Sequence, residues 1–221
     1  GERLVACGGF DLLFALLGAL GLAACALSLA LPESGRITTT APSLRRALQQ
    51  RVIRQGSGAM ALLGIPYGAL VGFLALLAQD RGLGSTGWAY AAFAAMVMAG
   101  GPLAGRLSDI WGRRRVVAPG ALLLALATGG LALVGSHWGM VALMALCGLG
   151  WGTLRTGLDA LVQDSAGPTL RASAAAAQYT AFDLGIGLGS WGLGALAAVA
   201  GYGPMFAAGA AATVVAAWLV W

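Results

Sequence analysis

Long apolar runs dominate this chain, and polar positions gather in short stretches between them. About 20 consecutive apolar residues are enough for a helix to cross the hydrocarbon core of a bilayer. Seven segments reach that length, at about 7–31, 57–78, 87–105, 116–134, 138–161, 173–198 and 203–221. The runs are continuously apolar rather than alternating, which favours helices over the strands of a membrane barrel. The pattern therefore predicts an all-α integral membrane protein with seven transmembrane helices.

The charged residues between these runs are unevenly distributed. All 13 basic residues are arginine, and most of them fall in every second connection: between the first and second spans, between the third and fourth, and between the fifth and sixth. The opposite connections contain only Arg81. Because basic connections stay on the cytoplasmic side, this pattern predicts a multi-pass protein of the inner or plasma membrane with a cytoplasmic C-terminus.

The longest connection, residues 32–55, has two parts. It opens with the polar, proline-containing stretch "PESGRITTTAPS" and continues with "LRRALQQRVIRQ", which suits a short basic helix lying on the inner leaflet. We interpret residues 1–31 as the last transmembrane helix of an N-terminal unit, 32–55 as a cytoplasmic central linker, and 56–221 as a six-helix transmembrane bundle. On this interpretation the chain is a piece of a longer protein.

Composition supports the membrane assignment and narrows the chemistry. Hydrophobic residues make up 59% of the chain and charged residues 10%, proportions that a water-soluble domain of this length does not tolerate. The 36 glycines suit closely packed membrane helices. The net charge of +5 follows the connections between spans, so we expect no nucleic-acid partner. The three cysteines lie in apolar runs without metal-ligand spacing, and we expect neither a metal site nor a catalytic residue.

One charged stretch, "GRLSDIWGRRR" at residues 105–115, interrupts two apolar runs. It resembles the signature loop of the major facilitator superfamily, G-x-L-x-D-x-x-G-R-R/K, which joins the second and third helices of a six-helix half. The matching residues are Gly105, Leu107, Asp109, Gly112, Arg113 and Arg114. The later stretch "QYTAFDLGIGLGSWGLGALAAVAGYGPMF" is similar to the last two helices of bacterial proton-coupled drug and sugar exporters. The resemblance implies the last seven helices of a twelve-helix fold, with 56–221 as the C-terminal half.

Physical chemistry suggests what this hinge does. Gly105 is expected to end one helix, and Gly112 permits the next turn. Asp109 and Arg113 stand four residues apart and would face each other on a helical turn; Asp109 could instead cap a helix N-terminus. The resemblance implies a conformational latch formed by Gly105, Asp109, Gly112 and Arg113. The last two arginines would anchor the loop to anionic headgroups, or all four arginines would only set the topology.

Few ionisable residues fall inside the spans, where each one is costly and therefore a candidate for function. Asp183 lies close to mid-depth, where desolvation favours its protonated form, which suits a proton carrier. It could equally accept hydrogen bonds from a neighbouring helix and only hold the bundle together. Arg155 and Asp159 are four residues apart and can neutralise each other, so they could bind substrate, gate the inner mouth or serve packing alone.

Three polar or aromatic residues complete the candidates for a central cavity: Tyr67, Gln178 and Tyr179. Tyr67 follows Pro66 midway along its span, where a kink would expose it to the pathway. Each of the three could instead serve packing.

The resemblance implies a secondary active transporter, an antiporter that exports small amphipathic or neutral molecules by alternating access. Its energy source would be the proton gradient, with no cofactor. Its partners would be a small-molecule substrate, the lipid bilayer and the N-terminal half of the same transporter. The alternative is a seven-helix receptor or scaffold without transport. The sequence shows no histidine cluster and no nucleophile with a base, so we do not expect an enzyme. Substrate, direction of transport, coupling ion and oligomeric state stay open.

Overall fold

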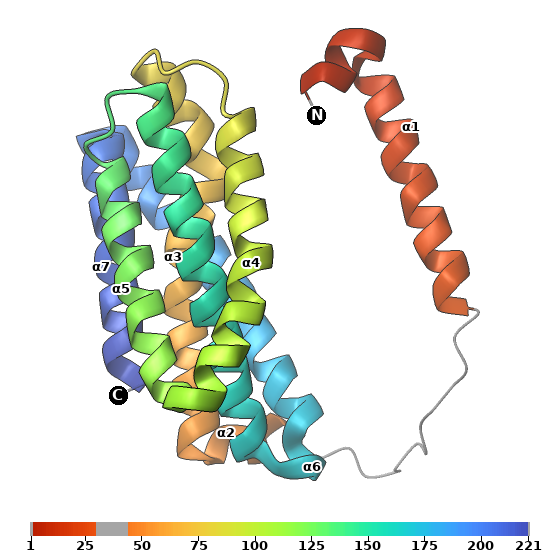
Figure 1. The fold of residues 1–221 in the computed structure, drawn as a ribbon, viewed down its shortest axis with the longest axis vertical. Coiled ribbons are helices and arrows are strands. Elements are labelled where there is room, and N and C mark those ends of the chain that lie inside the picture. Colours follow the sequence, from red (N-terminus) through yellow and green to blue (C-terminus); the bar gives the residue numbers. More distant parts are fainter. Residues whose placement is uncertain (1, 30–43, 221) are drawn as a thin grey trace. The chain divides into compact units, whose positions relative to one another are not determined.

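The computed structural model describes residues 2–29 and 44–220, and every regular element in this part is a helix. The helices, labelled in Figure 1, are α1 (Glu2–Leu29), α2 (Leu44–Gln49), α3 (Arg51–Asp80), α4 (Gly87–Trp111), α5 (Arg113–Leu131), α6 (His137–Ala200) and α7 (Tyr202–Val220). The all-α prediction is confirmed. The chain divides into two units, Gly1–Ala41 and Pro42–Trp221. The first contains α1, and the second, called the bundle below, contains the other helices.

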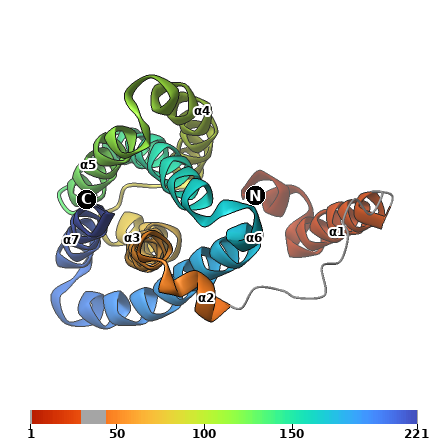
Figure 2. The ribbon, with the colours of Figure 1, turned by 90° about the horizontal axis from the view of Figure 1, so that it is seen from below.

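Helix α6 contains two membrane spans in one 64-residue element. Gly167 interrupts it with φ 65° and ψ 169°, a conformation that favours glycine, and Pro168 then begins the next helical stretch. The chain reverses direction there, so that a first arm (residues 137–166) and a second arm (residues 168–200) run back along each other's length (Figures 1 and 2). These arms are the spans predicted at 138–161 and 173–198.

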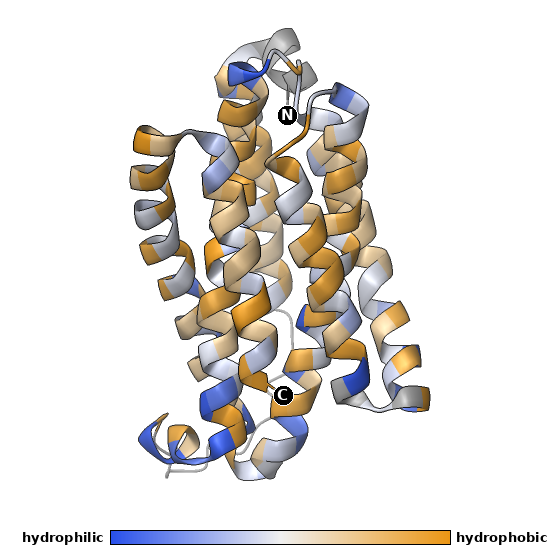
Figure 3. Ribbon diagram, turned by 90° about the vertical axis from the view of Figure 1, so that its left-hand side faces the viewer, coloured by the Kyte–Doolittle hydropathy of each residue, from blue (hydrophilic) through white to orange (hydrophobic). Residues whose placement is uncertain are grey.

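The distribution of hydropathy along the bundle is that of a membrane protein. Hydrophilic positions gather at its two ends, and the middle of the helices is mostly hydrophobic (Figure 3). Five described helices, α6 among them, are long and apolar enough to span a bilayer, and α5 contributes the shorter apolar stretch Arg115–Leu131. With the two arms of α6 counted separately, the described helices supply the seven predicted spans.

The first arm of α6 packs against α4 and α5 at distances that only glycine permits. A methyl group at Gly148 would overlap the carbonyl oxygen of Phe93 in α4, and one at Gly152 would lie 2.6 Å from the carbonyl oxygen of Val97. On the other side of the arm, a methyl group at Gly150 would lie 2.7 Å from the backbone nitrogen of Leu124 in α5. Backbones of neighbouring helices therefore touch directly, as small residues allow in membranes.

The second arm meets α3 in the same way. A methyl group at Gly185 would overlap the carbonyl oxygen of Ala61, and one at Gly64 would overlap the carbonyl oxygen of Phe182. Seen from below, α3 lies between α7 and the two arms of α6 (Figure 2). Helix α6 thus contacts α3, α4 and α5 through glycine on both of its arms.

The turns at the end of the bundle away from Gly167 are tied together by Arg81 and His137. The Arg81 guanidinium donates hydrogen bonds to the carbonyl oxygens of Val134 and Ala132, each at 2.8 Å, where α5 ends. His137 Nδ1 lies 3.0 Å from the carbonyl oxygen of Leu83. These bonds satisfy carbonyl groups that a helix end and a turn would otherwise leave unpaired. The lone arginine of the opposite connections is therefore a structural residue.

The end of the expected linker is helical and packs on the bundle. Within α2, Ala47 is fully buried in a small apolar cluster with Val162 and Ala166 of the first arm and Ala174 of the second, while Arg45 is exposed. The expected basic helix therefore has a protein contact as well as an exposed basic side. Helix α3 begins at Arg51, before the start of the span predicted at 57. The beginning of the linker, residues 32–43, lies outside the described residues.

The glycine contacts make a direct prediction. Gly185→Ala should destabilise the bundle by about 1–3 kcal/mol, because the added methyl group overlaps Ala61 and must push α3 away from α6. The matched control is Gly187→Ala on the same arm, where a methyl group meets nothing within 4 Å. Thermal unfolding of the purified variants in detergent measures both. Equal midpoints for the two variants would show that the α3–α6 contact does not limit stability.

Candidate functional site

Four aromatic rings meet where α3, α4 and the two arms of α6 converge. The ring centroid of Tyr67, in α3, lies 4.9 Å from that of Trp151 in the first arm and 5.3 Å from that of Phe182 in the second. Phe93 of α4 is 6.4 Å from Tyr67, and Trp151 and Phe182 are themselves 5.3 Å apart. Tilted and edge-on rings at these distances attract one another beyond simple burial.

Arg155 extends this cluster toward the outside of the bundle. Its guanidinium carbon lies 5.0 Å from the ring centroid of Tyr179, 5.1 Å from that of Phe182 and 5.9 Å from that of Trp151. Its Nε donates a hydrogen bond to Oδ2 of Asp159 at 3.1 Å, one helical turn along the first arm. The cation is therefore held by aromatic faces and by one carboxylate.

The cluster is partly accessible. The side chains of Arg155 and Asp159 are 21% and 34% exposed, and Tyr179 is 54% exposed. Below, the aromatic–arginine site means Tyr67, Phe93, Trp151, Arg155, Asp159, Tyr179 and Phe182. Such a surface can bind a ligand with an apolar ring, and its ion pair presents no net charge. An anion would compete with Asp159 for Arg155, and a proton on Asp159 would remove the ion pair.

The structure brings together four residues that the sequence singled out separately, namely Tyr67, Arg155, Asp159 and Tyr179. Helix α3 continues through Pro66 as one helix, so Tyr67 is positioned by an uninterrupted helix. Phe93, Trp151 and Phe182 were not among the candidates that the sequence indicated. The spacing of Trp151, Arg155 and Asp159 at intervals of four was a signal for the first arm alone. Nothing in the sequence indicated that the second arm and α4 add rings to it.

The structure corrects the placement of Gln178. It is buried, with 3% exposure, and it faces α3, so that its Nε2 would lie 3.9 Å from a methyl group at Gly56. Successive helical residues point about 100° apart, which is why Tyr179 reaches the site and Gln178 does not. Among the described residues, the Gln178 Nε2 and the neighbouring Ser57 Oγ have no hydrogen-bond partner.

Asp183 lies on an exposed part of the second arm. It borders a shallow hollow formed by α6 alone, together with Thr180 and Gly187. No hydrogen bond or ion pair joins it to another residue in the described part of the chain. Tyr179 precedes it by one helical turn and shares its face. Proton carrying by Asp183 stays a prediction.

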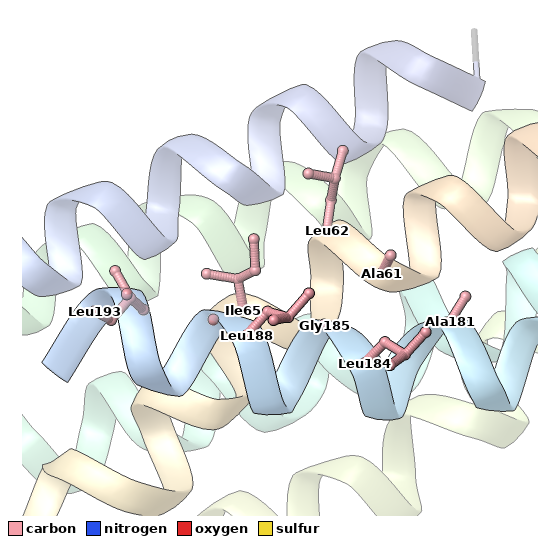
Figure 4. A pocket seen from close by; sticks show the side chains of 10 residues that line it. Ala61, Leu62, Ile65, Ala181, Leu184, Gly185, Leu188 and Leu193 are labelled. Atoms are coloured by element: carbon pink, nitrogen blue, oxygen red, sulfur yellow. The ribbon is translucent and has the colours of Figure 1, made fainter. Parts of the chain in front are cut away.

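A second hollow adjoins the first, since both are lined by Leu184 and Leu188; it lies between α3 and α6 and has a volume of about 540 Å³ (Figure 4). Its lining is apolar and includes Leu62 and Ile65 of α3 and Leu184 and Leu188 of α6. By helical spacing, Leu184 and Leu188 face away from Tyr179. The hollow is therefore separate from the aromatic–arginine site.

The hinge at 105–115 differs from the expectation at its first glycine. Gly105 does not end a helix: α4 continues to Trp111, and Ser108 Oγ donates a hydrogen bond to the Gly105 carbonyl oxygen at 2.8 Å. The turn occurs at Gly112 instead, with φ 86° and ψ 149°. That conformation favours glycine, so the expectation for Gly112 holds.

This backbone also corrects the relation of Asp109 to Arg113. The two residues stand in different helices, because Gly112 separates the end of α4 from the start of α5. They therefore do not share one helical turn. Asp109 is exposed, and no side chain caps the start of α5. The side chain of Arg113 lies outside the described part, and the latch stays a prediction.

The Arg155–Asp159 pair can be tested by a double-mutant cycle. The unfolding free energies of Arg155→Gln, Asp159→Asn and the double variant should give a coupling of about 0.5–1 kcal/mol, small because solvent screens a partly exposed pair. The control cycle uses Arg171 and Asp80, which lie at opposite ends of the bundle and should show no coupling. Identical coupling energies in the two cycles would mean that the 3.1 Å contact between Arg155 and Asp159 contributes nothing to the free energy of unfolding.

Among known families, residues 56–221 match the family model described as Major Facilitator Superfamily. The match covers the bundle from early in α3 to the end of the chain, and so includes every residue of the aromatic–arginine site and the hinge. No curated protein matches the chain.

Proposed function

Because the chain belongs to the major facilitator superfamily and is a multi-pass membrane transporter, we propose that it exports small amphipathic or neutral molecules in exchange for protons. The family match supports transport over the alternative of a seven-helix receptor or scaffold. Coupling, direction and substrate class are the parts of the proposal that rest on the site.

The observation that carries the proposal is the aromatic–arginine site. Its rings offer apolar faces and edges to a ligand. Its only described charges, on Arg155 and Asp159, already neutralise each other at 3.1 Å. A highly charged metabolite would leave part of its charge uncompensated there, which is costly in a membrane. Ring-containing molecules with little net charge therefore suit the site best.

A proton on Asp159 would change what the site offers. The neutral acid no longer forms an ion pair with the guanidinium, so that the contact weakens, while Arg155 keeps the faces of Tyr179, Phe182 and Trp151. Its N–H groups then become available to a hydrogen-bond acceptor of the substrate. Exchange of substrate for proton follows if the protonated and the ionised form of Asp159 favour conformations of the transporter that open to opposite sides of the membrane. Asp183, one turn beyond Tyr179, is the second candidate carrier.

The same bundle suits alternating access. Residues from α3, α4 and both arms of α6 form the site, and direct backbone contacts hold these helices together. In this proposal the bundle rocks as one body against a second six-helix half, with the site at the interface between the halves. The hinge residues Gly105, Asp109, Gly112 and Arg113 act as the cytoplasmic latch. The arginine-rich end and the C-terminus face the cytoplasm of a plasma or inner membrane.

The proposal is tested in inverted membrane vesicles that hold a proton gradient reported by a pH-sensitive dye. Addition of neutral and weakly cationic aromatic compounds should release protons and collapse the gradient. Asp159→Asn should reduce the response at least tenfold, because the amide can neither take up a proton nor form an ion pair with Arg155. Asp80→Asn, at the exposed end of α3 remote from the site, is the matched control and should respond like the wild type.

Asp183→Asn separates the two candidate carriers. Loss of the response in this variant alone would indicate that Asp183, and not Asp159, carries the proton. Survival of the full response in both variants would contradict coupling through either carboxylate. A panel of substrates that leaves the gradient unchanged in the wild type would contradict proton-coupled export.

A further inference from the structure

A small groove lies between α4, α5 and the first arm of α6, and it extends toward the arginine-rich hinge. It has a volume of about 150 Å³. Helix α4 contributes Leu103 and Leu107, helix α5 contributes Val116, Pro119 and Leu123, and Leu149 of α6 lies in its lining as well. From Val116 to Leu123 the groove follows α5 for about 10 Å, at the rise of 1.5 Å per residue.

The groove is built for an apolar occupant. Its one polar lining side chain, Thr153, donates to the carbonyl oxygens of its own helix, at 2.9 Å to Leu149 and 3.0 Å to Gly150. The hydroxyl therefore needs no hydrogen bond from a ligand. Leu103 and Pro119 are exposed at the sides of the groove, although both are apolar. Such a surface along the side of a membrane helix suits a hydrocarbon chain.

Two exposed arginines lie close in sequence to lining residues of the groove. Arg106 follows Leu103 by three residues on α4, and Arg115 precedes Pro119 by four residues on α5, so each shares a helix face with a lining residue. The stretch between them adds two more arginines and a single acid, Asp109. Positive charge therefore adjoins the apolar groove, in a connection that the arginine pattern predicts to lie at the cytoplasmic surface.

We propose that this groove binds an anionic glycerophospholipid of the inner leaflet. One acyl chain lies along Leu103, Leu107, Pro119 and Leu123, and the phosphate lies between the Arg106 and Arg115 guanidinium groups. The charge of the hinge selects an anionic headgroup over a zwitterionic one. The apolar groove adjoining the two cations selects a lipid over free phosphate. A bound lipid would join the ends of α4 and α5 across the Gly112 turn.

The test measures lipid binding to the purified protein in detergent by native mass spectrometry, with phosphatidylglycerol and phosphatidylcholine as probes. The wild type should retain phosphatidylglycerol in preference to phosphatidylcholine. Arg106→Gln with Arg115→Gln should lower the affinity for phosphatidylglycerol roughly ten- to thirty-fold, since each arginine near the surface contributes about a factor of five. The charge-matched control is Arg54→Gln with Arg171→Gln, two exposed arginines outside the groove, and it should retain the preference.

A second pair of variants tests the groove without changing charge. Leu123→Trp fills the part of the groove farthest from the arginines and should lower phosphatidylglycerol binding at least fivefold. Leu122→Trp adds the same side chain at the exposed neighbouring position and should bind normally. If only the arginine variants lose binding, the contact is a headgroup attraction without a groove, and the proposal is wrong. Equal retention of the two lipids by the wild type would also overturn it.

Discussion

The direct contact of glycine backbones along α6 is the constraint on which the rest of the bundle depends. Lipid is as apolar as leucine, so burial of side chains does not hold membrane helices together, and close packing must. Gly148 and Gly152 let the first arm approach α4, and Gly185 lets the second arm approach α3. The reversal at Gly167 places both arms in one bundle. One long helix thereby fixes the positions of its neighbours.

The aromatic–arginine site follows from these contacts. The carbonyl group of Phe93 meets Gly148, and that of Phe182 meets Gly64, so two of the rings belong to residues whose backbones form the glycine contacts. Tyr67 lies one turn along α3 from Gly64 and joins them. The site is therefore set by backbone geometry, and Arg155 is added at its accessible edge. A bundle held in this way suits the rigid-body movement on which the proposed alternating access depends.

The sequence was sufficient for whatever depends on periodicity and composition, and insufficient for contacts between helices. Apolar run lengths predicted the spans, the resemblance of residues 105–115 to a signature loop implied the family, and four-residue spacing predicted the Arg155–Asp159 pair. The same reasoning predicted Gln178 as a cavity residue, although it is buried against α3. A shift of one residue along a helix changes the direction of a side chain, and the sequence alone does not show which residue faces the cavity. The same reasoning also ended a helix at Gly105, although the Ser108 bond to its carbonyl and the turn at Gly112 carry α4 further. The rings of Phe93 and Phe182 reach Tyr67 only through packing.

If α6 holds α3, α4 and its own two arms as one rigid body, a distance between spin labels on these helices should stay constant. In a cysteine-free background, labels at Met98 on α4 and Trp191 on the second arm occupy exposed positions on separate helices of the bundle. The distance distribution should be single and unchanged when pH or substrate is varied. A second distance, or a shift with pH, would show that the bundle deforms internally and would contradict the account.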